Sequence, residues 1–460
     1  MKIVICGAGI VGSAIATHLA AEQNDVTVID SEQSRIERVT ERADVAAVVG
    51  VASHPDVLSQ AGLSDAELLI AVTESDEVNM VACQLAYHIF NTPMRIARIR
   101  SAAYLVNRES GLHAPDHFHI DHIISPETEV ANAAGRQLQL PGAFDVKDMG
   151  DGSVKLVGVL CEENCPILAT PLRHLTHLFP DLVMTILAII RGNKVIVPRD
   201  GSDELQAGDR VYFVSQADHV SRAMAAFGHH EAESSSVVIA GGGNIGLQLA
   251  KGLELNSEVT RSRLIELDKE QARSLAQELT HTSIVCGDAL EAEILKEAGV
   301  ASTETFVSVS NDDEVNILSA LLAKRIGAKH VVALVNMPGF VPLISTLGVD
   351  AVINPPQITV SSVLEHVRRG RIHDVHSVVE DLGEVLEAEA LPTSPLVGQS
   401  LRDSKIPKGV SVGAVLRGGS VIAARGDTII RAGDKVILFA RHGKSKQAEN
   451  ILTVKLGYFQ

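Results

Sequence analysis

The stretch "KIVICGAGIVGSAIATHLAAEQNDVTVID", residues 2 to 30, decides the fold. It opens with a short apolar strand, turns through GAGIVG into a helical run, and closes with a second strand that ends on Asp30. A G-x-G-x-x-G turn between a strand and a helix, followed about 20 residues later by an acid, is typical of a dinucleotide-binding βαβ unit. The stretch therefore predicts a parallel sheet with right-handed crossovers.

The same order of motifs returns in the second half of the chain. SVVIA, GGGNIG, LQLAKGLEL and SRLIEL follow one another between residues 236 and 267, with Glu266 in the place of Asp30. After each acid come a helical segment, a third strand and a Leu-rich helix, and then nearly the same phrase, AVTESDEVN at 71–79 and SVSNDDEVN at 308–316. Strands that alternate with helices at this spacing predict two α/β domains, each a Rossmann-like doubly wound parallel sheet.

A β-rich segment follows each of these large units. IIRGNKVIV (189–197) and VLRGGSVIA (415–423) read as hairpins with glycine-containing turns, so each large domain is expected to precede a small α+β domain. We place the linker between the two halves at HHEAESSS, which is polar and lacks periodicity. The expected domains are residues 1–125 and 233–352 for the two large units, and 140–225 and 370–455 for the two small ones.

The composition supports buried α/β layers and argues against nucleic acid as a partner. The chain has 460 residues, of which 46% are hydrophobic and only 3% aromatic, so its cores must be built from small aliphatic side chains. The formal net charge is -17, which repels phosphate backbones in spite of the local RRGR at 368–371.

Neither cysteines nor apolar runs indicate an extracellular or membrane-spanning chain. The five cysteines, including the close pair Cys161 and Cys165, are expected to be reduced thiols in or near a core. The amino terminus has too short an apolar run for a secretion signal, and LVMTILAII (182–190) falls short of the roughly 20 residues of a bilayer span. We expect a soluble, intracellular protein.

The two glycine turns are candidate phosphate sites. Gly7 permits the tight turn, Gly9 lets the backbone approach a pyrophosphate, and Gly12 lets the helix pack on the strand; Gly241, Gly243 and Gly246 repeat them. The N–H groups and dipole of the helix start then favour an anion. The alternative is that the turns serve packing alone.

The acids at the ends of the second strands indicate the class of ligand. Asp30 and Glu266 can each accept both ribose hydroxyls, and a 2′-phosphate beside them would meet like charge. No arginine follows either acid immediately, since Arg35 is a turn of helix away. NAD(H) or an adenine nucleotide is therefore expected in preference to NADP(H).

The repeated phrase is expected on the ligand side of the sheet. Ligands of open parallel sheets bind beyond the carboxyl ends of the strands, where Thr73 and Glu74 leave the fourth strand and Ser310 and Asn311 leave its copy. The alternative is a helix cap, with Ser75 or Asp76 at the first turn. The two interpretations use the same side chains.

These motifs in this order resemble the regulator-of-potassium-conductance (RCK) domains. Two G-x-G-x-x-G, acid and TESDEVN-type units in one chain, each followed by a small β-rich module, resemble the tandem arrangement in regulatory subunits of Trk potassium uptake systems, the TrkA type. The resemblance implies binding of NAD(H) or ATP/ADP as regulatory ligands and self-association into a ring, a homotetramer. It also implies docking on the cytosolic face of a membrane potassium-translocating subunit of TrkH/TrkG type.

The resemblance also implies ligand contacts at matching positions. Arg98 matches a basic residue of the fifth strand that can neutralise a phosphate, whereas Leu334 stands in its place in the second copy. GVAS (50–53) replaces the Gly-Asp-Ala that the second copy keeps around Asp288, so each site departs from the pattern once, and we expect the first to be the nucleotide-sensitive one. The candidate binding residues are Gly7, Ala8, Gly9, Ile10, Val11, Gly12, Asp30, Thr73, Glu74 and Arg98 in the first site, and Gly241, Gly242, Gly243, Asn244, Ile245, Gly246, Glu266, Asp288, Ser310 and Asn311 in the second.

An oxidoreductase and a metal-binding protein are two other interpretations of the sequence, besides a regulatory nucleotide sensor. An NAD-dependent oxidoreductase would need a proton donor or acceptor over the nicotinamide, and no catalytic constellation of this kind stands out in the small modules. The cluster His113, Asp116, His117, His119, Asp121 and His122 could hold a metal ion or form a solvated connector, and we expect the connector and no metal. We therefore expect a sensor and not an enzyme.

Overall fold

The computed structural model describes residues 1–105, 118–192, 194–199, 201–367, 372–378 and 382–452. It divides into two compact units. The first unit consists of Met1–Glu129 together with Pro355–Val367, and the second holds Val130–Asn354 and the described chain from Ile372 onward. Within the described residues no helix is long and apolar enough to span a bilayer.

The first unit is built on a six-stranded parallel sheet with the order β3-β2-β1-β4-β5-β6. The strand order reverses on either side of β1, so the carboxyl ends of β1 and β4 flank the switch point where ligands of such sheets bind. Its elements are β1 (Lys2–Cys6), α1 (Ile10–Ala21), β2 (Asp25–Asp30), α2 (Gln33–Arg42), β3 (Ala46–Val49), α3 (Pro55–Gln60), η1 (Leu63–Asp65), β4 (Leu68–Ala71), α4 (Asp76–His88), β5 (Met94–Arg98), η2 (Ala102–Tyr104), β6 (His122–Ile124) and α14 (Pro355–Val367).

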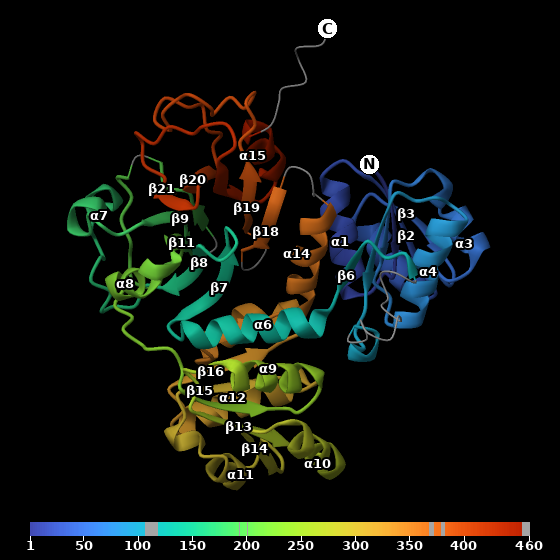
Figure 1. Cartoon of the computed structure of the whole chain (residues 1–460), viewed down its shortest axis with the longest axis horizontal. Coiled ribbons are helices and arrows are strands. Elements are labelled where there is room, and N and C mark those ends of the chain that lie inside the picture. The colour runs from blue at the N-terminus through green and yellow to red at the C-terminus, as the bar shows by residue number, and fades with distance from the viewer. Residues whose placement is uncertain (106–117, 193, 200, 368–371, 379–381, 453–460) are drawn as a thin grey trace. The chain divides into compact units, whose positions relative to one another are not determined.

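Helix α14 comes from the second half of the sequence but completes the core of the first unit. It lies beside α1 (Figure 1), and its Val363 and Leu364, both fully buried, belong to the same cluster as Ile15 and Leu19 of α1. The apolar face of α1 is therefore covered by a segment from the second repeat. Apolar patterning predicts that α1 has a buried face, but it does not say which helix covers it.

The second unit contains the other parallel sheet, with the order β14-β13-β12-β15-β16-β17. The order and direction match those of the first sheet, which confirms two Rossmann-like domains. Its elements are β12 (Ser236–Ala240), α9 (Asn244–Leu255), β13 (Arg261–Glu266), α10 (Lys269–Glu278), β14 (Thr282–Cys286), α11 (Ala292–Glu297), η4 (Val300–Ser302), β15 (Thr305–Ser308), α12 (Asp313–Ile326), β16 (His330–Leu334), η5 (Pro338–Phe340), α13 (Val341–Leu347) and β17 (Ala351–Ile353).

The two small domains are antiparallel sheets of the same topology. Their orders are β10-β9-β11-β8-β7 and β18-β19-β22-β20-β21, and both expected hairpins, β9–β10 and β20–β21, are present. The chain enters the first of them through α6 (Pro126–Gln139). The elements are β7 (Ala143–Met149), β8 (Val154–Leu160), α7 (Leu172–Leu178), β9 (Met184–Arg191), β10 (Lys194–Ile196), β11 (Arg210–Gln216), η3 (Ala217–His219), α8 (Val220–Ala226), β18 (Ile372–Ser377), β19 (Gly383–Glu389), β20 (Val410–Arg417), β21 (Ser420–Ala423), β22 (Lys435–Arg441) and α15 (Ser445–Leu452).

The small domains pack face to face within the second unit. Tyr212 of the first and Phe439 of the second are fully buried in one shared cluster. Around it, Lys147 Nζ lies 3.2 Å from Asp374 Oδ1, and His376 Nε2 lies 2.9 Å from Asp145 Oδ2. Asp145 and Asp374 occupy matching positions of β7 and β18, so the two contacts are related by the duplication.

The cysteines and the histidine-rich connector occupy ordinary structural positions where they are described. Cys161 and Cys165 are buried free thiols in the core of the first small domain, as expected. His113, Asp116 and His117 lie outside the described residues. His119 stacks on Tyr87 at 3.8 Å between ring centroids, and Asp121 pairs with Arg95 at 2.8 Å. No group of three potential ligands that could hold a metal occurs among the described residues.

Candidate functional site

The first glycine turn has no room for side chains at two of its three glycines. Gly7 has φ 107, and a Cβ there would lie 3.1 Å from the backbone N of Thr73 at the end of β4. A Cβ on Gly12 would lie 1.9 Å from the Gly7 carbonyl oxygen, so the close contact between α1 and the turn requires glycine. The turn therefore leaves the N-terminus of α1 open beside the end of β4.

Asp30 ties the turn to the end of β2. Its carboxylate accepts hydrogen bonds from the backbone N–H of Ala8 at 2.7 Å and of Glu32 at 2.9 Å. The side chain is also buried, with the residue only 8% exposed. From the sequence we expect Asp30 to be an exposed acid at the end of its strand, and this expectation is wrong because the residue is buried and its carboxylate bonds the turn.

The repeated phrase, TESDEVN at 73–79 and SNDDEVN at 310–316, ends on a buried asparagine that joins the ends of two strands. Asn79 Oδ1 accepts from the N–H of Thr73 at 2.9 Å, and Asn79 Nδ2 donates to the carbonyl of Thr73 at 3.2 Å and of Arg98 at 2.9 Å. Asn316 makes the matching contacts in the second copy, with Ser310 N–H at 2.8 Å and the Leu334 carbonyl at 3.0 Å. The phrase therefore fixes the carboxyl ends of the fourth and fifth strands relative to each other.

The acid three residues earlier, Asp76, has a role that differs from the expected helix cap. It accepts hydrogen bonds from the backbone N–H of Arg100 at 3.0 Å and of Ser101 at 2.8 Å, beyond the end of β5. Ser75 is the N-cap of α4 and accepts from Val78 N–H at 3.2 Å. The phrase thus caps α4 through Ser75 and binds the backbone after β5 through Asp76. The sequence alone does not show which residue has which role.

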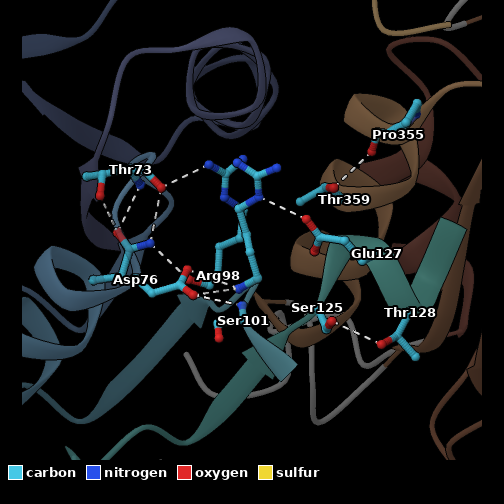
Figure 2. A network of polar contacts seen from close by, with 11 residues as sticks. Thr73, Asp76, Arg98, Ser101, Ser125, Glu127, Thr128, Pro355 and Thr359 are labelled. Carbon is cyan, nitrogen blue, oxygen red and sulfur yellow. Dashed lines mark hydrogen bonds and ion pairs between the residues drawn. The ribbon is translucent and has the colours of Figure 1, made fainter. Parts of the chain in front are cut away.

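Arg98 lies at the centre of the polar network at this edge of the sheet. Its Nη2 donates to the Thr73 carbonyl at 2.9 Å, while its Nε is buried and has no hydrogen-bond partner among the described residues. Burial and then the neighbouring Arg100 lower the pKa of Arg98 below its ordinary value. Figure 2 shows Thr73 and Asp76 on one side of the network and Glu127 and Thr359 on the other, with Arg98 between them.

Arg100 connects the network to the first turn of α6. Its Nε donates to Glu127 Oε1 at 2.8 Å, and Glu127 is 5% exposed. The second oxygen of Glu127, Oε2, is buried without a partner in the described chain. A buried donor and a buried acceptor therefore both have unused hydrogen-bonding capacity here, which is costly unless another group satisfies it.

Arg35 is a residue of this site that the spacing of the sequence does not reveal. Although it begins a turn beyond Asp30, its guanidinium reaches back to Glu32 at 2.9 Å and to Glu74 at 3.3 Å. Its Nη1 would lie 3.8 Å from a Cβ placed on Gly9, so positive charge stands directly over the glycine turn. Burial acts to lower the pKa of Arg35, but the charges of Asp30, Glu32 and Glu74 raise it.

The glycine turn and the strand-end acid of each repeat together form what we call a cradle. The first cradle is Gly7–Gly12 with Asp30, and the second, Gly241–Gly246 with Glu266, repeats its backbone geometry. Gly241 has φ 106, and a Cβ on Gly246 would lie 1.9 Å from the Gly241 carbonyl oxygen. Glu266 accepts from the N–H of Gly242 at 2.7 Å and of Asp268 at 2.8 Å, as Asp30 does in the first cradle. The two acids therefore have the same structural role.

Charge is the main difference between the two cradles. Strand pairing makes Leu334 the counterpart of Arg98, and the backbone contacts of Asp313 identify the counterpart of Arg100 in the same way. Arg35 is replaced by a glutamine whose Nε2 donates to the Gly242 carbonyl at 3.0 Å. The three arginines of the first cradle, Arg35, Arg98 and Arg100, thus correspond to Gln271, Leu334 and Asn336 in the second.

The remaining candidate residues are placed as follows. In the first cradle, Ala8 supplies the N–H that binds Asp30, Ile10 begins α1 and is 55% exposed, Val11 is buried, and Glu74 pairs with Arg35. In the second, Asn244 and Ile245 begin α9, and Asn311 is exposed beside Asp312, the N-cap of α12. Asp288 Oδ1 accepts from Leu290 N–H at 2.8 Å within its own turn.

The first cradle has groups that suit a phosphorylated nucleoside. It combines the glycine turn at the N-terminus of α1, a strand-end carboxylate for ribose hydroxyls, and the arginines Arg35, Arg98 and Arg100. The second cradle fits the ribose and the glycine-turn contacts in the same way but offers no arginine at the three matching positions.

Two glycine-turn parallel-sheet domains, each followed by a small antiparallel domain, define the class of this chain as a duplicated protein of alternating Rossmann-like and small antiparallel domains. Family models match accordingly: the TrkA-N domain covers residues 3–126 and 237–355, and the TrkA-C domain covers residues 156–228 and 385–453. The chain belongs to the TrkA family of Trk system potassium uptake proteins.

Full-length relatives agree with this assignment. The Trk system potassium uptake protein TrkA of Azorhizobium caulinodans is 51% identical over 459 residues, covering 100% of both chains. The protein of the same name from Halomonas elongata is 40% identical over 463 residues, again covering 100% of both.

Solved structures share the fold at low sequence identity. The GsuK channel superposes with a TM-score of 0.61 at 16% identity, covering 97% of this chain and 77% of that one. A structure described as the GsuK channel bound to NAD gives a TM-score of 0.58 at 17% identity, covering 98% and 78%. At these identities the likeness shows the fold alone.

Proposed function

We propose that the chain is a regulatory subunit that senses an adenine nucleotide, NAD(H) or ATP/ADP, at the first glycine turn and gates a Trk-type membrane potassium subunit. Membership of the TrkA family supports a role in potassium uptake. The NAD-bound GsuK channel, which shares the fold, supports a dinucleotide as one ligand. The partner would be a subunit of TrkH/TrkG type, with this chain peripheral on its cytoplasmic side.

The observation that carries the proposal is the partly buried guanidinium of Arg98, whose Nη2 donates to the carbonyl of Thr73 beyond the end of β4 and which forms no ion pair with a carboxylate among the described residues. A phosphate oxygen at the exposed side of this guanidinium would supply an acceptor and the opposite charge. The second cradle has Leu334 at this position, buried with 2% of its surface exposed. We therefore assign nucleotide sensing to the first cradle.

Isothermal titration calorimetry with NADH, ADP and ATP tests this assignment. Arg98→Leu copies the second cradle into the first and is expected to weaken ATP binding about tenfold or more, because a charge-assisted hydrogen bond is lost. Leu334→Arg is the reciprocal control and is expected to leave affinity at the first cradle unchanged. Wild-type protein that binds none of the three nucleotides would refute the proposal.

The switch works by differential affinity. A nucleotide that contacts the arginines in one arrangement of the domains more strongly than in another shifts their populations, and each tenfold preference contributes about 1.4 kcal/mol. Several identical sites in one ring could then drive a full transition of the membrane pore. Potassium flux in reconstituted vesicles should therefore differ between ATP and NADH, and equal flux with both would contradict nucleotide gating.

Self-association into a homotetrameric ring is part of the proposal. Leu318 on α12 and Leu343 and Leu347 on α13 are each at least 50% exposed, and exposed apolar side chains of this kind favour association. Leu343→Glu is expected to reduce the mass measured by light scattering after gel filtration. Gln277→Glu, at an exposed polar position of α10, is the control and should leave the mass unchanged.

The alternative function is an NAD-dependent oxidoreductase. It predicts that purified protein oxidises NADH when offered a suitable acceptor, whereas a sensor leaves the nucleotide intact. Recovery of unchanged NADH after incubation with candidate carbonyl substrates would support the regulatory function. Sustained turnover would support the enzyme.

A further inference from the structure

Asn79 has no exposed surface but connects Thr73, just beyond β4, with the Arg98 carbonyl at the end of β5. Its Oδ1 accepts from the Thr73 hydroxyl at 2.7 Å in addition to the Thr73 N–H, and its Nδ2 donates to the carbonyls of Thr73 and Arg98. One side chain thus satisfies four neighbouring groups. Because it is fully buried, it cannot itself touch a ligand at the edge of the sheet.

The contacts of Asn79 set the direction of the Thr73 hydroxyl. The hydroxyl proton points inward, toward Asn79 Oδ1 at 2.7 Å or the Ser75 carbonyl at 3.2 Å. The outward side of the oxygen then carries lone pairs, so Thr73 presents an acceptor to a ligand. An acceptor suits a ribose hydroxyl and disfavours a phosphate oxygen.

Asn79 also holds Arg98 at both ends. It binds the Arg98 carbonyl at 2.9 Å, and it binds the Thr73 carbonyl, which in turn accepts from Arg98 Nη2 at 2.9 Å. The guanidinium is therefore fixed through a carbonyl that Asn79 orients. Movement of that carbonyl would release the guanidinium from its position beside the turn.

We propose that Asn79 is the positioning residue of the first nucleotide site, which directs the Thr73 acceptor toward a ribose hydroxyl and the Arg98 guanidinium toward a phosphate. The inference rests on the proposed function and adds the residue that sets selectivity for phosphate charge. Asn79 acts through its two neighbours and does not contact the ligand.

The duplication supplies a matched control for a merely structural role. Asn316 is equally buried and makes the same backbone contacts, to Ser310 N–H at 2.8 Å, Ser310 carbonyl at 2.9 Å and Leu334 carbonyl at 3.0 Å. Leu334 stands where Arg98 stands in the first cradle, so Asn316 holds no guanidinium in position. A substitution at Asn316 therefore reproduces the structural damage without disturbing an arginine.

The test measures the ratio of the dissociation constants for AMP and ATP by calorimetry on the full chain. Asn79→Asp turns a donor into an acceptor that faces two carbonyl oxygens, and it is expected to reduce the ratio about tenfold because Arg98 loses its fixed position. Asn316→Asp is expected to leave the ratio at the first site unchanged. Asn79→Ser, which brings no charge, should shift the ratio in the same direction and replaces Asn79→Asp if that variant does not fold.

A double-mutant cycle identifies the route of the effect. In an Arg98→Ala background, Asn79→Asp should produce no further loss of the ratio. An unchanged ratio in Asn79→Asp and Asn79→Ser, with only the fraction of binding-competent protein reduced, would overturn the inference, as would an equal loss in Asn316→Asp. If the wild-type chain binds neither AMP nor ATP, the proposed function fails and this inference fails with it.

Discussion

Asp30 combines an observed structural role with the role in recognition that we propose for it. Its two oxygens already accept backbone N–H groups of the glycine turn and of the start of α2. A ribose hydroxyl would use the remaining lone pairs of the same oxygens. The turn is thus arranged before a ligand arrives, which lowers the entropy cost of binding.

Asp30→Ala is expected to lower nucleotide affinity and stability together. Two hydrogen bonds to a buried carboxylate are lost, which costs about 1–3 kcal/mol in the free energy of unfolding. Urea denaturation followed by circular dichroism measures this change, and calorimetry measures the affinity. A variant with wild-type stability would show that the N–H contacts of Ala8 and Glu32 contribute nothing.

Arg35→Gln copies the second cradle at another position and tests the preference between NADH and NADPH. Arg35 places a positive charge beside Asp30, so it lowers the repulsion that a 2′-phosphate would meet. The variant is therefore expected to weaken NADPH binding more than NADH binding, measured by competition against one fluorescent nucleotide. Equal losses for both dinucleotides would contradict a role in selectivity, and Gln271→Arg provides the reciprocal control.

The residue-level predictions from the sequence succeeded where local geometry dictates the residue type. Gly7 and Gly12 are required by a positive φ and by a contact that excludes a Cβ, and both constraints are visible in the motif. Arg35 was missed because helix spacing places its Cα a turn away, while the length of its side chain brings the guanidinium back. Sequence distance does not report the reach of a flexible side chain.

At the scale of elements, the predicted strands and both small hairpins are confirmed. Buried apolar runs bounded by glycine or polar residues suffice to predict β1, β2 and β4, because central parallel strands are buried on both faces. The role of the TESDEVN phrase was only half predicted. Its capping by Ser75 follows from local spacing, but Asn79 contacts the end of β5, 19 residues away, and Asp76 contacts Ser101, just beyond β5 and 25 residues away.

Glu254 on α9 gives a pH-dependent prediction for one element. Its carboxylate accepts backbone N–H groups of Thr280, His281 and Thr282, at 3.0, 2.8 and 2.9 Å, and so fixes the start of β14. Burial acts to raise its pKa, but these hydrogen bonds lower it to about 2. Because the pKa is depressed, the ionised carboxylate stabilises the fold fully at pH values above its ordinary pKa of 4.5. This stabilisation is lost as the pH falls toward 2.

Glu254→Gln is therefore expected to destabilise the second large domain at pH 7 and to matter less in acid. The difference in the free energy of unfolding between wild type and variant should shrink between about pH 5 and pH 2. Denaturant titrations at pH 7 and pH 3 measure it. A constant difference at both values would show that ionisation of Glu254 does not contribute.

At the scale of the whole molecule, the packing of α14 in the first unit makes the first half of the chain depend on the second. Leu364 lies in the second repeat but is fully buried in the core of the first unit. Nothing in the apolar pattern of α14 distinguishes packing against its own repeat from packing against the other. The fold class was therefore predictable from the sequence, and this pairing of segments was not.

Leu364→Ala should destabilise the first large domain although it alters the second half of the sequence. Removal of a buried leucine side chain costs about 2–5 kcal/mol. Hydrogen exchange at the amides of β1 and α1 should accelerate, and Leu255→Ala, at a position 89% exposed, should leave those amides unchanged. Faster exchange confined to residues after Val130 would show that α14 does not support the first unit.

The borrowed helix has a consequence for synthesis of the protein on the ribosome. At roughly 5–20 residues per second, Pro355 is translated on the order of 10 to 45 s after Glu129. During that interval the nascent amino-terminal domain displays the apolar side of α1 with no intramolecular partner, which invites chaperone capture or misassembly with neighbouring chains. Slower translation of the middle of the message should therefore lower the yield of native protein, even though no residue of the protein has changed.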